Sequence, residues 1–267
     1  MPGSLFRAFV CAVTAGAQAA IVLAMGTGPA TAAATAQAAP VNPALLDLEA
    51  RIEYGYFTED GRTLQGLANT PSGEDAKDGM KSYYAGLAGY RLTLLDSSRD
   101  KLQARSAAEE CVSSLDLALK ATPAAVPAES MALQSACLLH LSELSGLRAP
   151  FAGSKSRSQM EKAVRLAPRN PRVLLLDAIV AFERAPNGAE SERALGKLKR
   201  AIGALESERQ EVVHTPAWGL ADAYTYLGRV YLDRGDAVKA RDALERALLA
   251  APEFQQARRL MTKITSG

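Results

Sequence analysis

Histidine and cysteine are scarce in this 267-residue sequence, which contains two histidines and three cysteines. His140 and His214 lie far apart, and no CxxC or HExxH spacing occurs, so the sequence predicts no metal site and no cofactor. The GxSxG, phosphate-loop and GxGxxG patterns are missing as well. We therefore expect a protein that has no catalytic activity.

An excess of charge of one sign is also missing. The chain has 31 Lys and Arg against 29 Asp and Glu, a net charge of +2, and no basic cluster. Nucleic-acid binding is not expected, because neutralising phosphates requires a concentration of positive charge. With 48% hydrophobic and 22% charged residues, the chain should instead form a packed core.

Paired carboxylates occur at several places without a histidine or another reactive group beside them. The pairs are Glu49 with Glu53, Glu109 with Glu110, and Glu206 with Glu208. Such pairs are typical of the solvated faces of helices, and we expect these carboxylates to be exposed.

The first 38 residues have the pattern of a signal peptide. A weakly basic start at residues 1–7 precedes an apolar run at 8–25, and Ala34-Thr35-Ala36 and Ala36-Gln37-Ala38 match the small-x-small pattern of a cleavage site. This predicts a periplasmic or secreted protein without stable membrane insertion after cleavage. The alternative is an uncleaved segment that anchors the N-terminus in the membrane.

Downstream, apolar residues recur at spacings of three and four, which predicts helices throughout. Asn42-Pro43, Asn170-Pro171 and Thr215-Pro216 each place a capping side chain before a proline, as at a helix start. Gly86-Leu87-Ala88-Gly89 indicates close packing of two helices, and residues 146–153 are interpreted as a connector. The expected helices are 43–57, 61–69, 76–97, 99–121, 128–146, 156–167, 171–184, 189–207, 216–234, 237–250 and 253–265.

Cys111 and Cys137 lie at nearly the same distance from the expected turn between residues 121 and 128. Each falls on the apolar stripe of its helix, so the two thiols can face each other across a helix hairpin. An oxidising compartment would favour a disulfide between them. The alternative is two buried, unpaired thiols.

One segment fits a repeat pattern about 34 residues long. Its residues are Tyr224-x2-Leu227-Gly228-x2-Tyr231, Gly235, Ala240-x3-Leu244, Ala247 and Pro252. Residues 221–254 thus resemble a tetratricopeptide repeat (TPR), and the match weakens upstream. The resemblance implies an all-α, right-handed solenoid of stacked antiparallel hairpins. We expect irregular TPR-like hairpins over 40–150 and a TPR region over 151–267, closed by a capping helix at 253–265.

The resemblance also implies that inner helices line a concave groove for a protein or peptide partner. The groove-facing positions of the clearest repeat are Asp222, Thr225 and Arg229, and Trp218 lies on the same helix face. The preceding repeat would add Arg172, Leu175 and Ile179. The alternative is that Trp218 covers the preceding loop and that Arg229 is solvated.

The leading functional hypothesis is a protein-interaction scaffold of the bacterial cell envelope. A second hypothesis is a small-molecule-binding accessory module, for example of a transport system. Its aromatic pocket would be formed by N-terminal residues, namely Tyr54, Tyr56, Phe57, Tyr83, Tyr84 and Tyr90.

Overall fold

The computed structural model describes residues 42–144, 149–184, 188–209 and 216–265. The signal-peptide prediction for residues 1–38 lies outside these residues. Within them the chain is helical and contains no strand, which confirms the all-α prediction. Its helices are α1 (Pro43–Phe57), α2 (Gly61–Ala68), α3 (Gly79–Asp96), α4 (Lys101–Lys120), α5 (Pro127–Leu144), α6 (Ala149–Leu166), α7 (Pro171–Arg184), α8 (Gly188–Arg209), α9 (Leu220–Asp233), α10 (Ala237–Ala250) and α11 (Gln255–Thr265).

Two of the three predicted asparagine or threonine caps are confirmed. The Asn42 side chain accepts a hydrogen bond from the Ala44 N–H at 3.0 Å. The Asn170 side chain accepts one from the Arg172 N–H at 3.0 Å. Each cap satisfies a backbone donor that the first helical turn leaves without a partner.

The third predicted start, at Pro216, is wrong, because α9 begins four residues later at Leu220. The Ala217 N–H donates to the Glu49 carboxylate at 2.9 Å instead of entering a helix. Gly219 has a φ of 117°, and a Cβ there would come within 2.8 Å of a Leu175 methyl group. The connector prediction for 146–153 is also wrong over the residues described, since α6 begins at Ala149 and continues through Gly153.

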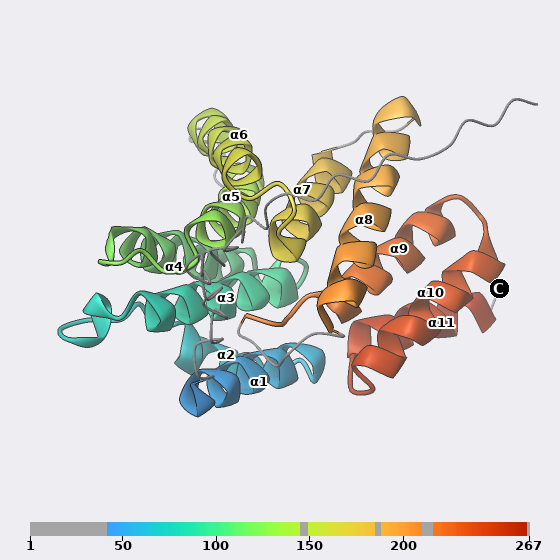
Figure 1. Cartoon of the computed structure of the whole chain (residues 1–267). Helices are drawn as coiled ribbons and strands as arrows, with labels where there is room; N and C mark the ends of the chain where they lie inside the picture. Colours follow the sequence, from blue (N-terminus) through green and yellow to red (C-terminus); the bar gives the residue numbers. More distant parts are fainter. Residues whose placement is uncertain (1–41, 145–148, 185–187, 210–215, 266–267) are drawn as a thin grey trace, which may run out of the picture. The chain divides into compact units, whose positions relative to one another are not determined.

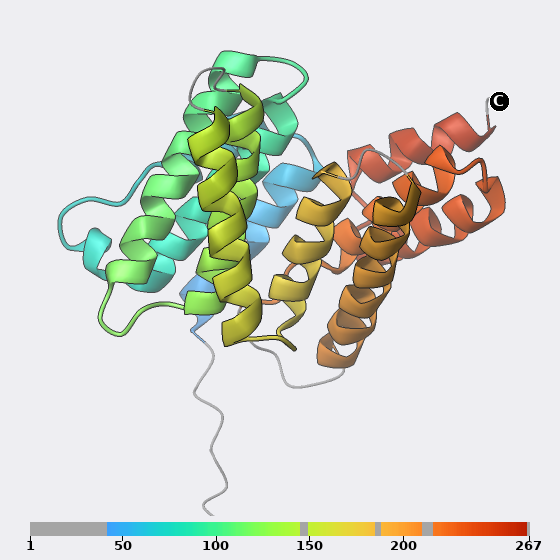
Figure 2. The same cartoon turned by 90° about the horizontal axis from the view of Figure 1, so that it is seen from above.

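Neighbouring helices pack side by side in pairs, α3 with α4, α5 with α6, α7 with α8, and α9 with α10 (Figures 1 and 2). The close approach predicted at Gly86 to Gly89 is confirmed for α3 and α4. A Cβ at Gly89 would lie 3.0 Å from the Ala107 carbonyl oxygen and 3.1 Å from the Cys111 backbone nitrogen. Helix α11 packs against α9 and α10 and buries Ala257 on its inner stripe.

Cys111 and Cys137 form a disulfide between α4 and α5, with Cα atoms 6.3 Å apart. The prediction of this bridge is confirmed. Both residues are fully buried, and the bridge joins the α3–α4 pair to the α5–α6 pair. Such a disulfide is compatible with an oxidising, exported compartment.

Candidate functional site

Six of the seven residues that were predicted to line a partner groove are buried. Trp218, Asp222, Thr225, Arg172, Leu175 and Ile179 are each at most 4% exposed. Arg229 is the exception, with a side chain that is 32% exposed. This face of α9 therefore differs from the open groove that the sequence predicted, because side chains from the N-terminal helices cover it.

Arg91 of α3 lies at the centre of the side chains that cover this face of α9. Its guanidinium binds both oxygens of the Asp222 carboxylate, at 2.7 and 2.8 Å. It also donates to both oxygens of Glu53 in α1, each at 2.9 Å. The same guanidinium lies over the rings of Tyr56 and Trp218, at 4.3 and 5.2 Å from their centroids. Arg91 thus joins α1, α3 and α9 in a site that excludes water.

Arg172 of α7 holds a second buried group of charges. Its guanidinium donates to Glu129 of α5 at 3.1 Å and pairs with Glu208 of α8. The other Glu129 oxygen accepts from the Tyr83 hydroxyl at 3.2 Å, and the Trp218 indole N–H donates to that hydroxyl at 2.9 Å. The predicted groove position of Arg172 is therefore filled by partners from this chain.

The buried carboxylates have altered acidity. Burial raises the pKa of Glu53 to about 8, against the attraction of the Arg91 guanidinium. Burial also raises the pKa of Glu49, which accepts hydrogen bonds from Tyr84 and from the Ala217 backbone. The prediction that Glu49 and Glu53 are solvated is wrong, because both carboxylates lie under the face of α9.

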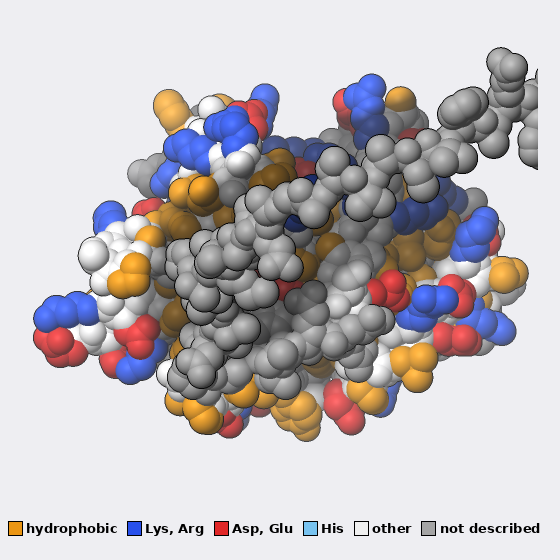
Figure 3. All heavy atoms as spheres, viewed as in Figure 1, with side chains coloured by type: hydrophobic (Ala, Val, Ile, Leu, Met, Phe, Trp, Pro, Cys, Tyr) orange, Lys and Arg blue, Asp and Glu red, His pale blue; other side chains and the backbone are white. Residues whose placement is uncertain are grey.

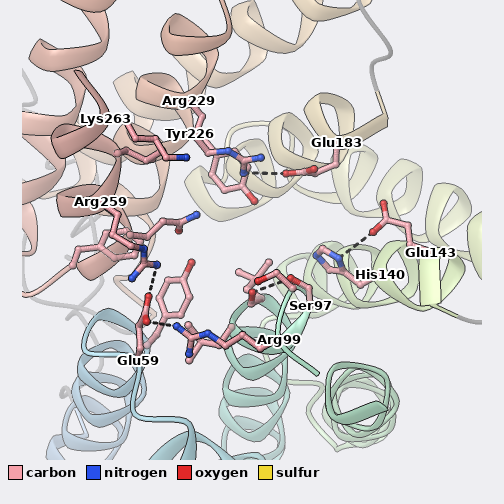
Figure 4. A pocket seen from close by; sticks show the side chains of 17 residues that line it. Glu59, Ser97, Arg99, His140, Glu143, Glu183, Tyr226, Arg229, Arg259 and Lys263 are labelled. Atoms are coloured by element: carbon pink, nitrogen blue, oxygen red, sulfur yellow. Dashed lines mark hydrogen bonds and ion pairs between the residues drawn. The ribbon is translucent and has the colours of Figure 1, made fainter. Parts of the chain in front are cut away.

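A pocket of about 450 Å³ remains open beside this covered face. Its lining comes from the ends of α1, α3 and α5, from Glu183 of α7, and from α9 and α11 (Figure 4). Arg229 lines it, so one of the seven predicted positions belongs to this site. Of the six aromatic residues in the alternative N-terminal pocket, only Tyr56 lines it; Tyr54 is exposed, and Tyr83, Tyr84 and Tyr90 are buried in the core.

Charged side chains of both signs line the pocket. Glu59 pairs with Arg99 and with Arg259, and hydrogen bonds from these two arginines overcome partial burial and hold the pKa of Glu59 below its ordinary value. Arg229 pairs with Glu183 at 3.2 Å.

Aromatic and imidazole groups complete the lining. The Arg229 guanidinium lies 4.9 Å from the centroid of the Tyr226 ring, which also lines the pocket. His140 is partly buried, and its Nδ1 lies 3.4 Å from Glu143. The pocket thus offers guanidinium and carboxylate groups next to aromatic rings, but no nucleophile activated by a neighbouring base.

No family model matches this sequence, and no curated protein matches it. The function therefore has to be inferred from the site itself. Over the described ranges, no three His, Cys, Asp or Glu side chains gather in a way that could hold a metal ion. None of the helices in those ranges has both the length and the apolar character that crossing a bilayer requires.

Proposed function

We propose that this protein is an exported, non-catalytic interaction module that holds a segment of a partner protein in the pocket between α1, α9 and α11. In this proposal the helix pairs form a right-handed TPR-like solenoid, of which α3, α5, α7, α9 and α11 are the inner helices. The signal-peptide pattern at residues 1–38 and the Cys111–Cys137 disulfide both favour a periplasmic location.

The observation that carries this proposal is the composition of the pocket. Residues of the five helices that would face inward in such a solenoid, or residues directly next to these helices, line the pocket. Its arginine and tyrosine side chains belong to the residue types that are enriched where proteins bind partners. On the face seen in Figure 3, basic and acidic side chains are also interspersed over α10 and α11.

Two adjacent glutamines on α11 allow a matched test. Gln256 lines the pocket, whereas Gln255 on the same turn does not. Gln256→Trp should fill the pocket, and Gln255→Trp adds the same bulk outside it. We expect chemical cross-linking in the native envelope to recover a defined partner with the wild type and with Gln255→Trp, and not with Gln256→Trp.

Circular dichroism melting of all three proteins checks that each variant is folded. Equal recovery of the partner by both variants would show that the pocket is not the binding site. Failure of the wild type to recover any specific partner would contradict the scaffold proposal.

A small-molecule ligand is the second candidate, because about 450 Å³ lies within the range of ligand pockets, roughly 300–1,000 Å³. A protein-free extract of small metabolites that raises the melting temperature of the wild type and not of Gln256→Trp would favour this candidate. The same extract should leave the melting temperature unchanged if only a protein segment binds.

A further inference from the structure

The charges of the pocket are divided between two sides. Figure 4 shows Glu59, Arg259 and Lys263 on one side and Glu183, His140 and Glu143 on the other. With Arg99, the first side has three cations and a single carboxylate. The second side has two carboxylates, faced by Arg229 and by His140, which adds a positive charge only when it is protonated. The pocket is therefore positive at one end and negative at the other.

The positive end keeps unused hydrogen-bond donors. Arg99 and Arg259 each pair with the one carboxylate of Glu59 through a single terminal nitrogen. A guanidinium has five N–H donors, so most donors of both arginines remain for another acceptor. Their side chains are 52% and 55% exposed, which leaves them accessible. Lys263 lines the same end and forms no ion pair with a described side chain.

The negative end has the opposite imbalance. Glu183 and Glu143 are 26% and 51% exposed. Among the guanidinium groups that line the pocket, Arg229 pairs with Glu183, whereas Glu143 interacts electrostatically with Arg184, which lies outside the lining. A carboxylate accepts up to about four hydrogen bonds, and Arg229 uses one nitrogen on one oxygen of Glu183. Between the two ends, the Tyr226 hydroxyl forms no hydrogen bond with a described residue.

We propose that the ligand of this pocket is an amphoteric peptide segment. Its Lys or Arg side chain would lie against Glu183 and Glu143, and its carboxylate, from Asp or Glu, against Arg99, Arg259 and Lys263. This inference rests on the proposed function and names the chemistry of the partner segment. A peptide with charges of one sign would leave one end of the pocket facing a like charge, which costs affinity.

Four capped pentapeptides of equal length test this directly. They are Ac-Lys-Ala-Ala-Ala-Glu-NH2, its reversed sequence, and the two peptides that carry Lys or Glu at both ends. Isothermal titration of the purified chain with each peptide gives four dissociation constants. We expect at least one mixed peptide to bind about tenfold more tightly than either same-sign peptide, and this difference to shrink at high salt.

A charge reversal at Lys263 locates the carboxylate end. In Lys263→Glu the mixed peptide should lose about tenfold in affinity while the Lys-Lys peptide gains. Lys199→Glu is the matched control, because Lys199 is an exposed lysine of α8 outside the pocket and undergoes the same change of charge. Its titrations should match those of the wild type.

The possible results separate this inference from the proposed function. Four similar affinities, or no binding of any peptide at 1 mM, would overturn the amphoteric ligand. If the cross-linking experiment still recovers a partner that Gln256→Trp loses, the interaction module stands and only the ligand chemistry is wrong. If the partner is missing too, both proposals fall.

Discussion

The buried arginine of α3 permits a quantitative test of how the N-terminal and C-terminal helices are held together. Replacing Arg91 by Met keeps a long side chain and removes the guanidinium that binds Glu53 and Asp222. Arg91 is 1% exposed and Asp222 is 3% exposed, so no water can replace the lost hydrogen bonds without a rearrangement. The substitution leaves two acids facing each other in the core.

The expected cost follows from this burial. Removing one partner of a buried ion pair destabilises proteins by about 3–5 kcal/mol, because the remaining charge is left without compensation. Arg99→Met is the matched control, since Arg99 is 52% exposed and its acid, Glu59, keeps Arg259 as a partner. Exposed pairs contribute about 0–1 kcal/mol, and the control should lose no more than that.

Urea unfolding followed by far-ultraviolet circular dichroism at pH 7, with the disulfide intact, measures both free energies of unfolding. The loss in free energy of unfolding caused by Arg91→Met should be smaller at pH 5 and larger at pH 8 than at pH 7. A buried carboxyl group that is protonated is neutral, and it therefore needs no counterion. Adding Asp222→Leu to Arg91→Met should recover part of the loss. If Arg91→Met and Arg99→Met lower the free energy of unfolding by amounts within about 1 kcal/mol of each other, the reasoning from burial is wrong.

Three further predictions concern the core. Burial raises the pKa of Glu53 to about 8, so the folded chain binds the proton of this carboxyl group more tightly than the unfolded chain does. The free energy of unfolding should therefore fall between pH 5 and 8 by up to about 1.4 kcal/mol per pH unit. Glu53→Gln should flatten this slope, as measured by urea titrations. Replacing Cys111 and Cys137 together by Ala should lower the free energy of unfolding by about 3 kcal/mol, measured by urea titration beside the oxidised wild type; an unchanged midpoint would contradict a role in stability. Gly89→Ala should destabilise by roughly 1–3 kcal/mol because its Cβ meets backbone atoms of α4, whereas Gly196→Ala, at an open helical position, should stabilise by up to about 1 kcal/mol; thermal melts that show equal shifts would refute the close approach.

The helices and the disulfide could be predicted from the sequence because both depend on local patterns. Apolar spacing and asparagine caps act within a few residues, and the two cysteines lie 26 residues apart in one hairpin-forming stretch. The helix start predicted at Pro216 is wrong because the Ala217 backbone N–H donates a hydrogen bond to the Glu49 carboxylate. This contact overrides the local preference for a helix start.

The covered face of α9 could not be predicted in the same way. The partners of Asp222 and Ala217 lie 131 and 168 positions earlier in the chain. Glu53 has the sequence surroundings of an ordinary surface carboxylate, and no local signal distinguishes it. Arg229 was identified because it lies on a regular helix face, whereas Arg259 and Glu59 meet only when α11 reaches α1.

The ion pair between Arg91 and Asp222 also restricts where residues can be inserted into this chain or deleted from it. In arrays where each repeat contacts only its neighbours, a unit can be gained or lost in the middle without disturbing distant parts. Here, inserting or deleting a helix pair between α3 and α9 would separate a guanidinium and a carboxylate that now meet in the core. The number of helices between them is therefore constrained by one long-range ion pair. Added residues should be tolerated mainly in the loops and at the two ends of the chain.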